Sequence, residues 1–235
     1  MKQSTTNYNP ETAPRITLHY LWQEVLSSLS WDKGFFFTCK QLLINPGAAI
    51  REYLAGERKR YSNPIRFLVF ATALASFVVI KLDLIGRALG EDILENGDEH
   101  AQQAQQEVIA FVYQYYNVIG FLMVPLLALI TYVLFRRRGY NYAEHLTLAA
   151  FVTAEYTLLY LLATLGLYYY PALFNSITQL LWFVYFTWAI VSFFPEKKWK
   201  AVGIAVLINI IYFLTIMLVA GVIGIIFRTL SGAEG

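Results

Sequence analysis

Three ionisable side chains stand in one apolar stretch, "EHLTLAAFVTAE", which contains Glu144, His145 and Glu155. On an α-helix Glu144 and Glu155 lie about 20° apart on one stripe, and His145 shares that flank only loosely. Glu155 lies about 16 Å further along the helix than Glu144. This depth is close to the centre of a bilayer whose hydrocarbon is about 30 Å thick. The two carboxylates could form half of a proton or cation path, or Glu155 could be one neutral, hydrogen-bonded structural residue.

A carboxylate near the bilayer centre needs a stabilising partner, because placing its charged form there costs at least about 2.5 kcal/mol. No lysine or arginine occurs at matching depth in any apolar block. Glu155 must therefore be protonated, hydrated in a cavity, or paired with polar groups or a cation. Polar residues of the other apolar blocks are candidate neighbours, Thr187 among them. The predicted intramembrane polar site consists of Glu155, Glu144, His145, Asn117, Asn209 and Gln179.

Other signs of enzyme chemistry are missing from the sequence. It contains no P-loop, dinucleotide-binding glycine pattern, HExxH or G-x-S-x-G motif, and its three histidines are scattered. The single cysteine, Cys39, excludes an intrachain disulfide framework and a cysteine-based zinc cluster. The acidic segment 91–107 is interpreted as a solvated face rather than a cation site. We therefore expect no metal site and no cofactor, and an enzyme is not the favoured interpretation.

The elements that must position these residues are long apolar blocks. Of the 235 residues, 57% are hydrophobic and only 14% are charged, which favours an integral membrane protein over a soluble one. The sequence predicts an all-α membrane protein with five transmembrane helices. The N-terminus lacks an apolar signal-peptide core, so no cleavable signal peptide is expected. The predicted blocks run roughly over Ile65–Leu82, Val108–Phe135, Leu146–Tyr170, Ala172–Phe194 and Ala201–Phe227.

Charged connections set the predicted orientation of these blocks. The residues before the first block are basic, the connection 83–107 is acidic, "RRRGYNY" is basic, "YYYP" is uncharged and "PEKKWK" is basic. Because basic loops stay in the cytoplasm, the N-terminus is predicted to be cytoplasmic and the C-terminus outside. We expect the protein in an inner (cytoplasmic) membrane. The alternation also supports a crossing by the first block, which Arg66 and Lys81 make marginal in length.

Residues 16–62, which we call the collar, are predicted to form short amphipathic cytoplasmic helices. They follow a loose polar tail, 1–15, and precede the transmembrane domain, 63–235. Apolar residues in 16–30 follow a helical spacing. A second helix, capped by Ser30 or Asp32, should stop before Pro46, and a third should begin at Pro46 and end at Gly56.

The collar ends in a basic cluster, which suggests contact with anionic lipid headgroups or a phosphate group. The helix N-terminus at Pro46–Gly47 could supply further donors. The alternative is that these charges only set the topology. The predicted lipid- or phosphate-binding residues are Arg51, Arg58, Lys59, Arg60 and Arg66.

The stretch "WDKGFFFTCKQLLINPGAAIREYLAGERKRYSNPIRFL" resembles an uncharacterised bacterial membrane-protein family, number 3667 among the domains of unknown function. The resemblance extends over roughly residues 15–230, and members also tend to open a middle span with a polar pair like Glu144–His145. Many members begin with a zinc-ribbon-like CxxC pair, which this chain lacks. The resemblance implies the membrane fold and no particular activity.

Three functions remain open at this point. The first is a structural or regulatory protein whose collar contacts membrane lipids or a protein partner. The second is a transporter or channel for protons or cations that uses Glu155 and requires a homo-oligomer, because five helices are few to enclose a path. The third is a lipid-modifying enzyme with Glu144, His145 and the basic cluster at the inner leaflet. No nucleic-acid partner is expected.

Overall fold

Five helices of the protein are long and apolar enough to cross a membrane. The computed structural model describes residues 34–82, 99–167, 171–194 and 198–231, and these residues form helices and short connections without any strand. The prediction of an all-α protein with five transmembrane helices is confirmed. The five are α4 (Pro64–Lys81), α6 (Glu99–Phe135), α7 (Tyr142–Leu167), α8 (Pro171–Phe193) and α9 (Lys198–Ser231).

Two short helices precede the bundle, α2 (Phe35–Ile44) and α3 (Pro46–Ala55). Asn45 separates them, and its side chain accepts a hydrogen bond from the backbone N–H of Ala48 at 3.2 Å. Pro46 occupies the first turn of α3, where its missing N–H has no cost. Gly56 ends α3 with a φ of 116°, a left-handed conformation that favours glycine. These boundaries are the predicted ones, although the N-cap of α2 is Gly34 and makes no side-chain capping bond.

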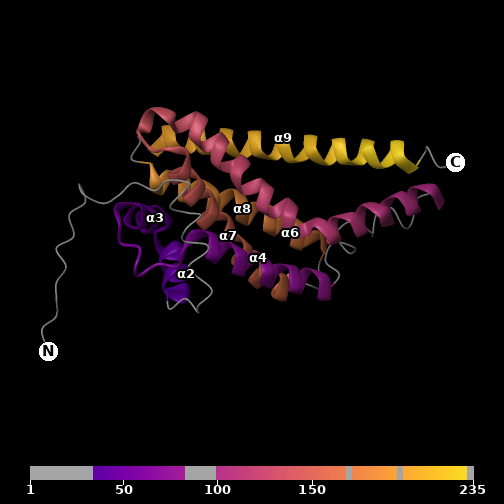
Figure 1. Ribbon diagram of the computed structural model, residues 1–235, viewed down its shortest axis with the longest axis horizontal. Helices are drawn as coiled ribbons and strands as arrows, with labels where there is room; N and C mark the ends of the chain where they lie inside the picture. The colour runs from indigo at the N-terminus through magenta and orange to yellow at the C-terminus, as the bar shows by residue number, and fades with distance from the viewer. Residues whose placement is uncertain (1–33, 83–98, 168–170, 195–197, 232–235) are drawn as a thin grey trace, which may run out of the picture.

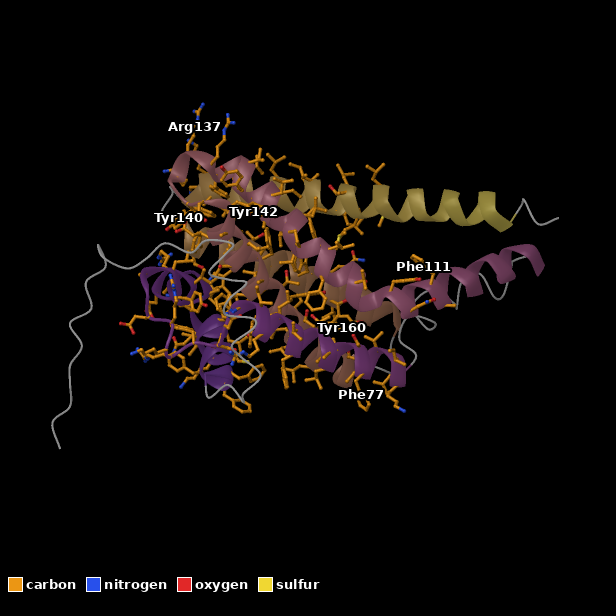
Figure 2. All side chains as sticks on the ribbon, viewed as in Figure 1. Phe77, Phe111, Arg137, Tyr140, Tyr142 and Tyr160 are labelled. Carbon is orange, nitrogen blue, oxygen red and sulfur yellow. The ribbon has the colours of Figure 1, made fainter. Side chains whose placement is uncertain are left out.

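The long helices alternate in direction along the bundle (Figure 1). A 3-10 turn, η1 (Arg136–Arg138), connects α6 to α7. In Figure 2, Arg137, Tyr140 and Tyr142 lie at the end of the molecule where α2 and α3 pack, and Phe77, Phe111 and Tyr160 lie toward the other end. The collar and the basic turn η1 thus share one end of the bundle.

Helix α7 forms the centre of the core. It contacts α4, α6 and α8 in the bundle and also α2 and α3 from the collar. Small side chains make this possible, since Ala149, Ala150 and Ala154 are buried and allow neighbouring backbones to approach. Phe151 is buried between Tyr53 of α3 and Phe67 of α4, with ring centroids 5.1 and 6.1 Å away. The collar and the bundle therefore share one apolar core.

Several predicted segments lie outside the described residues. They are the polar tail 1–15, the first predicted collar helix within 16–30 and most of the acidic connection. The predictions for these segments stay predictions. The division into tail, collar and transmembrane domain is likewise untested as a whole, although Asn63, at the predicted boundary, is the N-cap of α4.

Candidate functional site

The N-terminus of α3 packs directly against the C-terminal end of α8. The backbone N–H of Gly47 donates to Ser192 Oγ at 2.9 Å. A Cβ built on Gly47 would lie 2.1 Å from the Ser192 carbonyl carbon, far inside van der Waals contact. Glycine at position 47 is therefore required by the close approach of two helices. The sequence contains a Pro-Gly pair here, but it does not reveal which helix approaches it.

Arg51 joins the same contact from the next turn of α3. Its Nη1 donates to the backbone carbonyls of Ser192 and Phe193, the latter at 2.9 Å. These carbonyls belong to the last turn of α8, where cations are favoured by the helix dipole. We predicted Arg51 as a lipid or phosphate ligand. That role is untested, and the structure directs this guanidinium nitrogen toward α8.

A second contact fixes α2 against the start of α4. The backbone N–H of Ser62 donates to Thr38 Oγ1 at 2.7 Å, and Thr38 is fully buried. Gly34 lies so close to the backbone of residues 60–62 that an added Cβ would meet it at 2.8 Å. Tyr61 donates to Glu52 Oε2 at 2.7 Å, and burial, together with this carboxylate, raises the pKa of the Tyr61 phenol. The described part of the collar is a packed unit.

The outer face of α2 is apolar, with one lysine. Phe36 is 82% exposed and Ile44 60% exposed, and Leu43 is also exposed. Lys40 lies on the same face, because residues 36, 40, 43 and 44 follow the helical spacing. Exposure of this face to water would be unfavourable, because burying apolar side chains away from water lowers the free energy. Such a face is typical of a helix that lies in the membrane interface.

The basic residues of the collar are arranged around the turn that follows α3. Lys59 and Arg60 are exposed, and Arg58 and Arg66 are partly exposed. The guanidinium of Arg60 lies 4.8 Å from the centroid of the Phe37 ring, a cation–π geometry that holds Arg60 beside α2. Lys40 thus lies on the exposed apolar face of α2, and Arg60 lies beside the same helix.

Glu144 has a structural partner. Its backbone N–H donates to Asn141 Oδ1 at 3.0 Å, and its Oε2 accepts from the Asn141 N–H at 2.7 Å. This reciprocal pair is a capping box, in which a polar N-cap residue and a glutamate three positions later satisfy each other's backbone donors. The signal N-x-x-E was present in the sequence, and we missed it. The carboxylate of Glu144 is thereby turned back toward the loop before α7.

His145 is enclosed by aromatic rings. It is only 1% exposed, and its Nδ1 lies 3.1 Å from Thr131 Oγ1. The rings of Tyr132, Tyr140 and Phe194 surround it at centroid distances of 5.7, 6.4 and 5.8 Å. Its Nε2 is buried and has no hydrogen-bond partner. Glu144 and His145 are neighbours in sequence, but the described contacts of their side chains join them to different groups.

Glu155 lies deep inside the protein, beneath the collar. It is 1% exposed, and its Oε2 has no hydrogen-bond partner. Its charge acts on Cys39 of α2, whose thiol pKa burial and Glu155 together raise to about 12. Tyr185 of α8 lies within electrostatic range of both. The carboxylate predicted near the bilayer centre is therefore surrounded by α2, α7 and α8.

The remaining predicted polar residues lie elsewhere. Gln179 and Asn209 line a pocket of about 860 Å³ formed by α6, α7, α8 and α9. Glu155 does not line this pocket. Asn117 belongs to α6, but its side chain lies outside what the structure describes. Among the described residues, no group of three or more His, Cys, Asp or Glu side chains could hold a metal ion. The five predicted site residues whose side chains the structure describes thus fall into at least three separate surroundings.

Comparisons with known proteins agree with the resemblance seen in the sequence. No curated protein and no solved structure shows significant similarity to the chain. One family model matches a segment of the chain, residues 32–75, which runs from just before α2 through α3 into α4. It therefore covers the packed part of the collar and the helix on which it rests. Over residues 32–75 the chain matches the family described as "Protein of unknown function (DUF3667)".

Proposed function

We propose that this multi-pass membrane protein has a structural or regulatory role in which the collar contacts the lipids of the inner leaflet. The observation that carries this proposal is the apolar outer face of α2, with Phe36, Leu43 and Ile44 exposed. A membrane-embedded bundle with such a helix packed on its side can cover that face with lipid, with an apolar partner or with the amphipathic helix predicted within residues 16–30. Lipid is always present, so it is the occupant we favour.

Charge supports contact with anionic headgroups in particular. Lys40 on α2 and Lys59 and Arg60 in the turn after α3 are all exposed, and Arg60 lies beside α2. Each basic residue near an anionic surface contributes about 1 kcal/mol to binding. Because Arg51 and Gly47 hold α3 against α8, these cations are presented by a preorganised surface. A protein partner in the membrane, or a second copy of the chain, would use the same surface.

The proposal can be tested by measuring how deep α2 lies in a bilayer. A nitroxide attached at Phe36→Cys, in a Cys39→Ser background, should be protected from a water-soluble relaxation agent and reached by molecular oxygen. The matched control is Arg137→Cys in the same background, because Arg137 is exposed in the charged turn η1 at the collar end of the bundle. That label should show the opposite pattern. Equal exposure of both labels to the water-soluble agent would refute the proposal.

We also propose a location and an orientation for the protein. We place the collar in the cytoplasm of a bacterium and the C-terminal end of α9 outside the inner membrane. The basic turn η1 supports this orientation, because it lies at the collar end of the bundle (Figure 2) and basic segments stay inside.

Proton or cation transport is a second candidate, carried by the buried carboxylate oxygen of Glu155 that has no partner. A buried polar atom without a hydrogen bond is costly and marks a site where a proton, ion or water would be stabilising. The test is proton or cation flux into liposomes that contain the protein. Flux should vanish in Glu155→Gln and persist in Glu144→Gln, and equal flux in both variants would refute transport by Glu155.

The enzyme alternative finds no support in the described geometry. It required a cleft at the inner leaflet that joins Glu144 and His145 to the basic cluster of residues 58–60. The described contacts instead join Glu144 to the N-cap Asn141 and surround His145 with rings. We do not pursue this alternative.

A further inference from the structure

The pocket between α6, α7, α8 and α9 is lined mostly by apolar and aromatic side chains and lies apart from the collar. Its volume of about 860 Å³ is in the range of pockets that hold a drug-sized ligand. Five aromatic side chains line it, Tyr156, Trp182, Phe183, Tyr212 and Phe213. Leu214 and Met217, also in the lining, are more than half exposed, so the pocket opens onto the face of the bundle that meets lipid.

Polar groups converge on this apolar pocket from three helices, namely Thr153 of α7, Gln179 of α8 and Asn209 of α9. Asn209 is 7% exposed. Its Nδ2 donates to Ala205 O at 2.9 Å and to Thr187 Oγ1 at 3.4 Å, and its Oδ1 has no partner. This oxygen can accept one more hydrogen bond, and leaving it unpaired inside a membrane protein costs free energy.

Thr153 gives an independent indication. Elsewhere in α7, Thr147, Thr157 and Thr164 each donate their hydroxyl to the carbonyl four residues earlier, at 2.8 to 3.0 Å. Thr153 makes no such bond, and its buried Oγ1 has no partner. Two residues that line the same pocket, on two different helices, thus each have a buried polar atom without a hydrogen-bond partner. A ligand that enters between them and hydrogen bonds with these atoms would remove that cost.

The lining also limits the charge of the ligand. Among the lining residues that the structure describes, none is Asp, Glu, Lys, Arg or His. A charged headgroup would be desolvated there without a counter-charge, at a high cost. The free Asn209 oxygen requires a donor, and a hydroxyl group is the neutral donor that membrane lipids carry.

We propose that this pocket binds a neutral lipid whose small headgroup carries a free hydroxyl, with the hydroxyl donating to Asn209 and the chain lying against the aromatic lining. Diacylglycerols and long-chain prenyl alcohols share this chemistry. Binding at this pocket is independent of the collar and of the role proposed for it.

The test titrates the full-length protein in detergent micelles with each lipid and counts bound molecules by native mass spectrometry. One arm uses dioleoylglycerol and the other a long-chain prenyl alcohol, each beside its acetate ester, in which the hydroxyl is blocked. The hydroxyl form of at least one lipid should bind more tightly than its ester, and the arm in which this happens identifies the source. Asn209→Leu should weaken binding of that hydroxyl form about fivefold to tenfold, the worth of one buried hydrogen bond, and leave the ester unchanged.

Two glycine variants supply a matched steric control. Gly120 lines the pocket, Gly203 does not, and neither has any atom within 4 Å of an added Cβ. Gly120→Phe should fill the pocket and abolish binding of both lipid forms, whereas Gly203→Phe should bind like the wild type. The proposal is overturned by equal binding of hydroxyl and ester forms, by equal binding of phosphatidylglycerol, or by undiminished binding in Gly120→Phe. The same mass spectra report the oligomeric state. The proposal is also overturned if Gly120→Phe converts a dimer into a monomer without changing lipid binding, because the pocket would then be an interface between two copies of the chain.

Discussion

Gly47 determines how closely α3 approaches α8. Glycine inside a helix is ordinarily unfavourable by about 1 kcal/mol relative to alanine. Here a methyl group would overlap the backbone of Ser192 and Phe193, with contacts of 2.1 to 2.4 Å. Because the neighbour is backbone, it cannot rotate away, and one of the two helices must shift.

Gly47→Ala should therefore lower the stability of the protein, by about 1–3 kcal/mol as for other overpacked sites. The measurement is the thermal unfolding midpoint in detergent. Gly203→Ala is the control, because its added methyl group has nothing within 4 Å and improves helix propensity. It should leave the midpoint unchanged or raise it, and a fall of equal size in both variants would contradict the steric argument.

Cys39 should react slowly with thiol reagents at neutral pH. Only the thiolate is nucleophilic, and burial, together with the charge of Glu155, raises the pKa of Cys39 to about 12. The alkylation rate should keep rising as the pH increases toward 12, because the thiolate fraction grows up to the pKa. A double variant, Lys59→Cys with Cys39→Ser, carries an exposed thiol. Its alkylation rate should level off near pH 8.5, the ordinary pKa of a free thiol. Matching pH profiles for the two proteins would show that Cys39 is an ordinary exposed thiol.

Local contacts of the site can be read from the residue types, although we missed one of them, whereas long-range contacts cannot. The N-x-x-E pattern that joins Asn141 to Glu144 is readable from spacing alone, because both partners lie within one turn. The surroundings of Glu155 depend on α2, which lies more than a hundred residues earlier in the chain and packs across α7. Helical spacing within α7 carries no information about that neighbour, so the sequence identified the buried carboxylate without the groups that enclose it.

The ends of the short helices follow local rules and were predictable. Asn45, Pro46 and Gly56 each act through their own backbone preference, so α3 begins and ends at the expected residues. The docking of α3 on α8 could not be predicted, because it depends on the meeting of Gly47 and Arg51 with the last turn of α8. A basic residue close to a basic cluster suggested lipid contact for Arg51, whereas its observed partners are helix-terminal carbonyls.

Arg51 should stabilise the α3–α8 contact through two charge-assisted hydrogen bonds to α8. Arg51→Gln is expected to cost about 1.5–3 kcal/mol, since it leaves the carbonyls of Ser192 and Phe193 without this donor. Arg51→Lys should rescue part of this loss, because a single nitrogen, Nη1, makes both bonds and an ammonium can also donate to two carbonyls. Hydrogen exchange of α3 amides measures the loosening directly. Arg137→Gln, at an exposed position in η1, is the control, and equal loosening there would mean that net charge, not the contact, is responsible.

At the scale of the whole molecule, the five helices and the charges at their ends specify one topology. Helices that alternate in direction bring the collar and η1 to one end and the C-terminal ends of α4, α7 and α9 to the other (Figure 1). If all five helices cross, the collar and the end of α9 are expected on opposite sides of the membrane. Because basic segments remain in the cytoplasm, the collar end is expected inside.

Accessibility of single cysteines tests this topology in intact spheroplasts with a membrane-impermeant maleimide. In a Cys39→Ser background, Lys81→Cys at the end of α4 should react from outside, because Lys81 is exposed at the end opposite the collar. Lys59→Cys and Arg137→Cys, both at the collar end, should react only after the membrane is opened. If α4 did not cross, Lys59→Cys and Lys81→Cys would react from the same side, and Arg137→Cys would react from the opposite side to Lys59→Cys. That result would leave four crossings and remove the charge argument, which rests on α4 separating the basic collar from the acidic connection.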